Sequence, residues 1–149
     1  MAVVRLDCFL LCQEVSQSVG SPLLNLQGLI PGPVTIDFSK APPFGAPLAF
    51  PSLWAIAIFS GMSGIRDLEL SWELRPPGDQ GVLILPKQKV TREQPDETHT
   101  IANRYAPFMI PTAGKYTFTV TLTIEDETRS FSRTLDVRAG TAPQPGRVQ

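Results

Sequence analysis

Prolines are spread through most of this chain, and they limit which secondary structures it can form. The sequence holds 15 prolines in 149 residues, about twice the average usage of roughly 5%. Because proline lacks the amide hydrogen and its ring clashes with the preceding helical turn, an uninterrupted helix needs a proline-free window. Few windows of helical length remain, so we expect little helix.

The windows between the prolines show alternation, most clearly from residue 115 to residue 125. Polar residues occupy one parity there, and apolar residues occupy the other: Tyr116, Phe118, Val120, Leu122 and Ile124. This period of two predicts a strand with one buried and one solvated face. Residues 128–137 repeat the pattern after the polar link 125–127, so we expect an antiparallel hairpin. Arg133 breaks the inward pattern, and we expect it at an edge or with its charge extended to solvent.

Two upstream segments predict further strands. Residues 67–75 alternate between charged or polar and apolar side chains, which predicts a strand with one charged face. Residues 53–59 are apolar on both parities and predict a central strand covered on both sides. Other strand patterns occupy 3–15, 23–30, 34–38, 82–85 and 98–108, whereas the charged segment 87–97 predicts an exposed loop.

The length and the strand spacing together predict the fold class. A chain of 149 residues has room for one domain with one sizeable core. Short strands separated by Gly/Pro turns are typical of sandwiches and barrels. We therefore predict an all-β fold, a single immunoglobulin-like antiparallel β-sandwich of about eight strands. It is expected over residues 1–138, followed by a disordered Pro/Gly-rich tail over 139–149.

The charge balance restricts the classes of partner. Thirteen basic and fourteen acidic side chains give a net charge of -1. No global field draws such a chain onto phosphate backbones or anionic lipid, so we expect no nucleic-acid partner. The longest apolar stretch, 48–59, contains Pro51 and is shorter than the ~20 residues of a membrane helix, so we expect no membrane partner.

The two cysteines, Cys8 and Cys12, indicate the redox environment. Four residues along one strand separate their Cα atoms by roughly 13 Å, too far for a disulfide between them. The N-terminal segment also lacks the pattern of a secretory signal. We therefore expect two reduced thiols on one side of a strand and a cytoplasmic protein, or a virion protein if the chain is phage-encoded.

The motifs of common catalytic and cofactor sites are missing from the sequence. His99 is the single histidine. A nucleophile elbow needs a glycine two residues after its serine, but the residue two positions after Ser63 is Ile65. The cysteines lack the spacing of a structural zinc site. No glycine-rich phosphate motif occurs. We therefore predict that the chain is not an enzyme and has no catalytic residue, cofactor or metal.

An acidic strand face gives the alternative function. Asp67, Glu69 and Glu73 share one face of the predicted strand 67–75, and a solvated face is the simpler explanation for them. If these carboxylates met His99 in a concave pocket, they would suit a small-molecule or carbohydrate ligand. The alternative prediction is therefore a ligand-binding sandwich.

The segment 41–51 has the most unusual local composition. It is rigid, apolar and rich in proline, so it loses little conformational entropy on binding. Pro42, Pro43, Phe44 and Phe50 are the predicted contacts with a protein partner or with another copy of the chain. In the other interpretation this loop packs its own phenylalanines on the sandwich.

Three segments also carry a family resemblance. The first segment is an apolar strand with a Cys-acid ending at 9–15, followed at 24–30 by a strand with an apolar-Gly-apolar step. The second is the strand entry at 51–56. The third is the string Pro-Thr-Ala-Gly-Lys-Tyr-Thr-Phe at 111–118. Their order resembles an uncharacterised family of short bacterial and phage-associated β-sandwich proteins. The loop 42–51 is richer in proline than in the family, and Gln13 stands where an acid is commoner.

The resemblance implies a fold and no catalytic residue, because the family has no established activity. Together with the missing motifs it favours a non-enzymatic sandwich that works through protein contacts. Such a protein would be a bacterial binding module or a phage structural or accessory component.

Overall fold

A computed structural model describes residues 4–17, 24–38, 48–78 and 81–140 of the chain. The predicted tail 141–149 and the predicted contacts Pro42, Pro43 and Phe44 lie outside these residues. No helix within the described ranges is long and apolar enough to cross a membrane.

The described residues form twelve strands. In chain order these are β1 (Arg5–Gln17), β2 (Leu24–Leu29), β3 (Val34–Ile36), β4 (Leu48–Phe50), β5 (Leu53–Ser60), β6 (Asp67–Arg75), β7 (Leu83–Ile84), β8 (Gln88–Thr91), β9 (His99–Tyr105), β10 (Phe108–Ile110), β11 (Gly114–Ile124) and β12 (Glu127–Ala139). The all-β prediction is confirmed.

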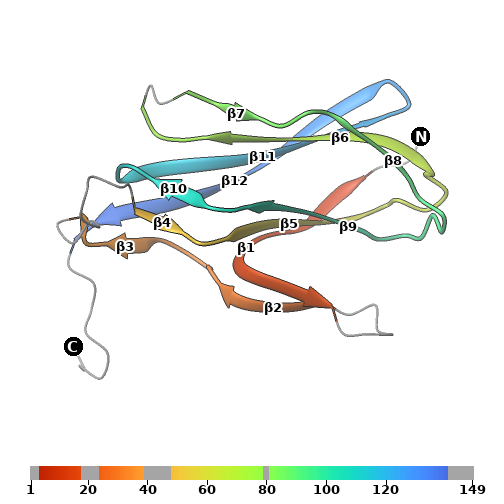
Figure 1. Ribbon diagram of the computed structural model, residues 1–149. Helices are drawn as coiled ribbons and strands as arrows, with labels where there is room; N and C mark the ends of the chain where they lie inside the picture. Colours follow the sequence, from red (N-terminus) through yellow and green to blue (C-terminus); the bar gives the residue numbers. More distant parts are fainter. Residues whose placement is uncertain (1–3, 18–23, 39–47, 79–80, 141–149) are drawn as a thin grey trace.

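The strands pack as two layers (Figure 1). One sheet has the order β2-β1-β5-β9, and the other has the order β3-β12-β11-β6-β7, with β8 also paired to β6. A short third ladder joins β10 to β4. All pairings are antiparallel except that of β3 with β12, which is parallel. The sandwich prediction is therefore confirmed, with this one parallel pair added.

The predicted hairpin is β11 and β12, paired from Gly114 and Val137 to Ile124 and Glu127. Its turn is shorter than expected: Glu125 and Asp126 alone connect the strands, with φ angles of 50° and 68°. On its outer face three hydroxyl pairs bond across the strands at 2.8–3.0 Å, namely Thr119 with Ser132, Thr121 with Ser130 and Thr123 with Thr128. This face is solvated, as the alternation predicts.

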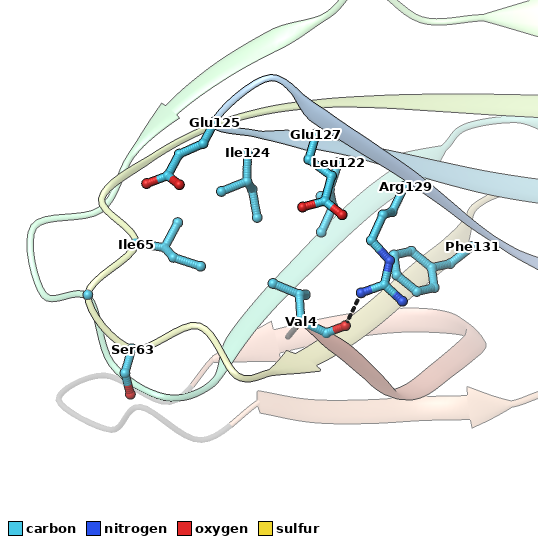
Figure 2. A pocket seen from close by; sticks show the side chains of 10 residues that line it. Val4, Ser63, Ile65, Leu122, Ile124, Glu125, Glu127, Arg129 and Phe131 are labelled. Carbon is cyan, nitrogen blue, oxygen red and sulfur yellow. Dashed lines mark hydrogen bonds between the residues drawn. The ribbon is translucent and has the colours of Figure 1, made fainter. Parts of the chain in front are cut away.

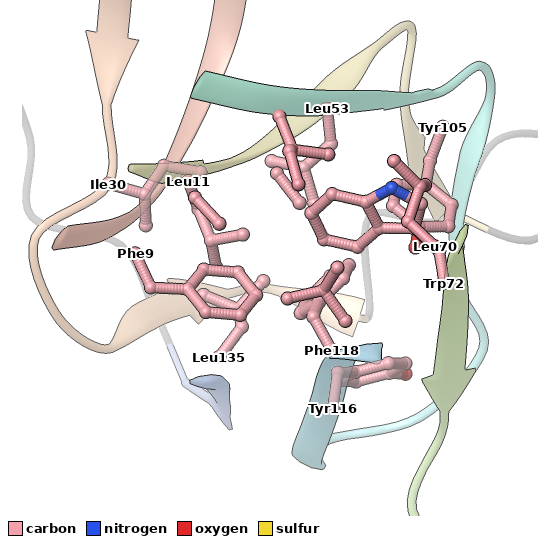
Figure 3. Packing of buried hydrophobic residues seen from close by; sticks show 14 of the residues in the cluster. Phe9, Leu11, Ile30, Leu53, Leu70, Trp72, Tyr105, Tyr116, Phe118 and Leu135 are labelled. Carbon is pink, nitrogen blue, oxygen red and sulfur yellow. The ribbon is translucent and has the colours of Figure 1, made fainter. Parts of the chain in front are cut away.

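The core lies between the two sheets (Figure 3). Phe108 is near its centre, with its ring centroid 5.5 Å from Tyr116 and 5.6 Å from Phe118. β5 supplies Leu53, Ala55, Ala57 and Phe59, all fully buried. Ile56, on the opposite face of β5, is 1% exposed, so the prediction of a strand covered on both sides holds at that position.

Arg133 points into the space between the sheets, which the sequence did not predict. Its Nη1 donates to the carbonyl oxygen of Phe9 at 2.9 Å, and its Nη2 donates to that of Ile30 at 3.4 Å. The guanidinium therefore links β12 to the opposite sheet by hydrogen bonds to backbone carbonyls.

Two predicted boundaries were wrong. The segment 87–97, expected as an exposed loop, contains β8, in which Lys89 lies opposite Glu69. Arg92 follows β8 and is buried, because four backbone carbonyls accept its hydrogen bonds: those of Met62, Ile65, Asp96 and Thr98. The tail does not begin at residue 139, since Ala139 pairs with Ile36 and the Gly140 amide donates to the Ile36 carbonyl.

Candidate functional site

Phe50 is the one predicted contact residue within the described part of the chain. It ends β4, is half-buried, and stacks on Phe108 with a centroid distance of 6.3 Å and an interplanar angle of 11°. One side of this ring therefore packs on the core. Its role in partner binding stays a prediction, as do those of Pro42, Pro43 and Phe44.

The acidic strand face does not form one site. Asp67 accepts a hydrogen bond from the Thr91 hydroxyl at 3.0 Å. Asp67 and Glu69 line a shallow hollow of about 370 Å³, but Glu73 lies farther along β6, opposite Ile84. No group of three or more potential metal ligands occurs among the described residues.

His99 lies in the other sheet, opposite Phe59. Burial is the main cause that lowers the pKa of His99, and the nearby charge of Arg92 adds to it. The imidazole is therefore biased toward its neutral form. The structure brings Asp67 and Glu69 together but not Glu73 and His99.

The cysteines are both free, as predicted. Cys8 is half-buried, and Cys12 is fully buried. Burial, with a smaller contribution from the charge of Glu14, raises the pKa of the Cys12 thiol. A protonated, inaccessible thiol is a poor nucleophile, so Cys12 acts as a small apolar residue.

A second hollow, the hairpin-end pocket, lies beside the β11–β12 turn (Figure 2). Its volume is about 440 Å³, which is within the range of small-molecule sites. Apolar and charged side chains both line it: Val4, Ile65, Leu122, Ile124 and Phe131 on the apolar side, and Glu125, Glu127 and Arg129 on the charged side.

Side-chain hydrogen bonds of Arg129 and Glu97 stabilise the two sides of this pocket. Arg129 donates from Nη1 to the Val4 carbonyl, and its guanidinium lies 5.2 Å from the centre of the Phe131 ring. On the opposite wall, Glu97 accepts hydrogen bonds from the Gly61 amide at 2.8 Å and the Ser63 hydroxyl at 2.7 Å. These bonds, that of Ser63 foremost, lower the pKa of Glu97. The Ser63 hydroxyl therefore links this side of the pocket to the segment that carries Glu97.

The strand β1 changes partner at Cys12. Residues 5–12 pair with β5, whereas 12–17 pair with β2. The second half of β1 turns back and leaves the layer together with β2 (Figure 1). We call residues 13–17 and 24–29 the wing. Gly28 lies in it with a φ of 67°, and a Cβ there would come within 2.7 Å of the Gln13 side chain, so the wing needs glycine at this position.

The wing exposes leucine side chains on both of its sides. Pairing places Leu26 opposite Val15 and Leu24 opposite Gln17, so these four residues share one side. Leu24 is 40% exposed and Leu26 is 37% exposed. The other side carries Glu14, Ser16, Asn25, Gln27 and Leu29, and Leu29 is 50% exposed. The sequence analysis predicted these strands but did not identify them as a site.

No protein-family model matches the chain, and no curated protein sequence matches it either. The resemblance to short bacterial and phage-associated sandwich proteins therefore stays a prediction. The candidate sites rest on the geometry of this chain alone.

Proposed function

We propose that the chain is a non-enzymatic β-sandwich that works through protein–protein contacts, and that the wing is its contact surface. The observation that carries this proposal is the exposure of the wing's leucines, since Leu24, Leu26 and Leu29 are each more than one-third exposed. A two-stranded hairpin is marginally stable by itself in water. If the hairpin also exposes leucines, its burial by another protein removes apolar surface from water and is therefore favourable.

The biological setting of the proposal follows the family resemblance. The chain would be a bacterial binding module or a phage structural or accessory protein. It would work in the cytoplasm or, in the phage case, in the virion.

Substitution in the wing tests the proposal. We would purify the chain and measure its mass by light scattering, both alone and after mixing with the proteins that co-purify with a tagged copy. Leu26→Lys should abolish any assembly or retained partner, because it replaces an exposed leucine of the wing by a charge. Thr100→Lys, on the exposed face of the end strand β9, is the matched control and should change neither.

The proposal fails if Leu26→Lys and the parent chain behave alike in both measurements. Circular dichroism and thermal melting of each variant would establish that the lysine has not unfolded the sandwich. A wing that can be charged without consequence is not a contact surface.

A second candidate function, small-molecule binding, is favoured by the hairpin-end pocket. Its mixture of apolar and charged side chains suits a ligand with both apolar and polar groups. A thermal-shift screen of amphipathic small molecules and sugars tests this function. Stabilisation by a ligand should be lost in Ile65→Arg, which fills the pocket, and kept in Leu26→Lys; a screen without any stabilising compound would count against it.

A further inference from the structure

We infer that a third hollow, the open-side pocket, binds a small uncharged molecule that is mostly apolar and carries a hydrogen-bond acceptor oxygen. This pocket shares no lining residue with the wing or with the hairpin-end pocket. Ligand binding there is therefore independent of the proposed contact function. The position of the pocket, the chemistry of its walls and the hydroxyl group of Tyr105 support this assignment.

The open-side pocket lies beside the end strands of both sheets. β7 is the last strand of one sheet, and β9 is the last strand of the other. Leu74 of β6 and Leu83 of β7 line the pocket from the first sheet, and Tyr105 of β9 and Phe108 of β10 line it from the other direction. Its volume is about 420 Å³, which is within the range of small-molecule sites.

The walls of the open-side pocket are apolar. Tyr105, Phe108 and Tyr116 are buried, whereas Leu83 and Met109 are 49% and 43% exposed. Buried rings therefore form the inner wall, and exposed apolar side chains surround the opening. A ligand that covers Leu83 and Met109 removes apolar surface from water, which favours binding.

Charge distinguishes this pocket from the hairpin-end pocket. The described residues that line the open-side pocket are all uncharged, whereas Glu125, Glu127 and Arg129 line the other. A charged ligand in the open-side pocket would lose water without meeting an opposite charge, which is costly. The lining thus selects an uncharged ligand.

The hydroxyl of Tyr105 indicates the polar group of the ligand. Its oxygen is buried and makes no hydrogen bond of ordinary geometry among the described residues. Burial raises the pKa of Tyr105, and the nearby Asn103 side chain lowers it to a smaller extent. An amide that lowers this pKa acts as a donor toward the phenol oxygen, so it does not accept the hydroxyl hydrogen. An acceptor oxygen on the ligand would satisfy that hydrogen.

The hydroxyl of Tyr116, by contrast, is already hydrogen-bonded. It donates to the Thr112 carbonyl at 2.6 Å and accepts from the Thr112 amide at 3.4 Å. Tyr105 and Tyr116 belong to the same buried cluster and line the same pocket (Figure 3). They differ in whether the hydroxyl hydrogen has an acceptor, which makes Tyr116 the matched control for Tyr105.

Three phenyl compounds of nearly equal size test the class of ligand. Acetophenone is uncharged and carries a carbonyl oxygen, α-methylstyrene has a methylene group in place of that oxygen, and benzoate is an anion. Titration of acetophenone should shift the methyl NMR signals of Leu83 and Met109. α-Methylstyrene should bind roughly threefold to tenfold more weakly, the range expected for one neutral hydrogen bond. Benzoate should bind at least about tenfold more weakly than acetophenone, because its charge has no partner there.

Substitution of the two tyrosines identifies the donor. Tyr105→Phe should remove the preference for acetophenone over α-methylstyrene, because it deletes the hydroxyl and keeps the ring. Tyr116→Phe should retain this preference. Tyr105→Phe should also melt no lower than the parent chain, since the hydroxyl that it removes makes no ordinary hydrogen bond.

Substitution in β7 tests the location. Leu83→Lys places a charge at the opening and should weaken acetophenone binding at least about tenfold. Ile84→Lys is the matched control, because Ile84 is the next residue of β7, is 68% exposed and lies opposite Glu73. Successive side chains of a strand point to opposite faces, so Ile84→Lys should bind acetophenone as the parent chain does.

Several results would overturn the assignment. The pocket is not a ligand site if acetophenone at its solubility limit shifts no signal of Leu83 or Met109, or if the shifts are confined to Ile65 and Leu122 of the hairpin-end pocket. Equal binding of benzoate and acetophenone would contradict the uncharged class of ligand. A preference for acetophenone that survives in Tyr105→Phe would show that this hydroxyl is not the donor.

Discussion

The β11–β12 and β1–β2 hairpins have similar sequence patterns and different surroundings. In β11 the inward side chains Tyr116, Phe118 and Val120 are at most 1% exposed. In the wing, Leu24 and Leu26 alternate in the same way but are 40% and 37% exposed. Alternation thus tells which side chains share a face of a strand, and it does not tell whether another layer covers that face.

The two hairpins also differ in their neighbours within the sheet. β11 has β12 on one side and β6 on the other, while β12 pairs with β11 along its length and with β3 at residues 137–139. β2 pairs with β1 alone. The β11–β12 hairpin is therefore built into the fold, while the wing can be changed with little effect on it. The predictions below test this difference by its energetic consequences.

The largest effect is expected at Tyr116, the largest fully buried side chain. Tyr116→Ala should lower the free energy of unfolding by roughly 3–5 kcal/mol, because it empties a volume in the centre of the core. The control Tyr116→Phe keeps the ring but removes the hydroxyl, which donates to the Thr112 carbonyl at 2.6 Å. Tyr116→Phe should lower the free energy of unfolding by only about 0.5–1.5 kcal/mol. Urea denaturation measures both, and a loss under about 1 kcal/mol for the alanine variant would contradict the core position of this ring.

The sequence was sufficient to predict what local patterns determine. The period of two at residues 115–124 identified the inward side of β11, and the apolar run 53–59 identified the central β5. Segment 87–97 was misassigned because the burial of Arg92 depends on carbonyls of Met62 and Ile65, far away in sequence. The charge of Arg92 suggested that this side chain is exposed to solvent, but hydrogen bonds to backbone carbonyls satisfy the guanidinium in the interior.

The candidate contact surface was predictable only in part. The strand pattern at 23–30 and the lack of charge in it are visible in the sequence. The change of partner at Cys12 is not, because it depends on which strands lie beside β1. The hairpin-end pocket was missed for a similar reason: Val4, Ile65 and Arg129 come from separate segments that only the fold brings together.

A smaller effect is expected at Arg133, which joins the two hairpins. Arg133→Met keeps much of the side-chain volume but removes the hydrogen bonds to the carbonyls of Phe9 and Ile30. We expect a loss of about 1–3 kcal/mol in the free energy of unfolding. Arg138→Met is the matched control: the Arg138 side chain is 64% exposed, and its ion pair with Asp136 contributes little. Equal losses in the two variants would mean that the link between the sheets does not stabilise the fold.

The turn of the β11–β12 hairpin should gain stability on substitution. Glu125 and Asp126 both have positive φ angles, which cost non-glycine residues free energy. The double variant Glu125→Asn, Asp126→Gly supplies the residues preferred in a two-residue turn with this backbone. It should raise the free energy of unfolding by about 1 kcal/mol, as measured by urea denaturation. No gain, or a loss, would indicate that the acidic side chains make interactions that offset their backbone strain.

The smallest effect is expected in the wing, where replacement of a leucine by alanine should be nearly neutral although the same replacement is costly in the core. Leu122 in β11 is 2% exposed, so Leu122→Ala should lower the free energy of unfolding by about 2–5 kcal/mol. Leu26→Ala should change the free energy of unfolding by less than about 0.5 kcal/mol, because its side chain is already 37% exposed. Both variants should be melted at low protein concentration, so that any association between copies does not contribute. A loss at Leu26 comparable to that at Leu122 would mean that the wing is part of the core of a single chain, and the distinction between the two hairpins would then disappear.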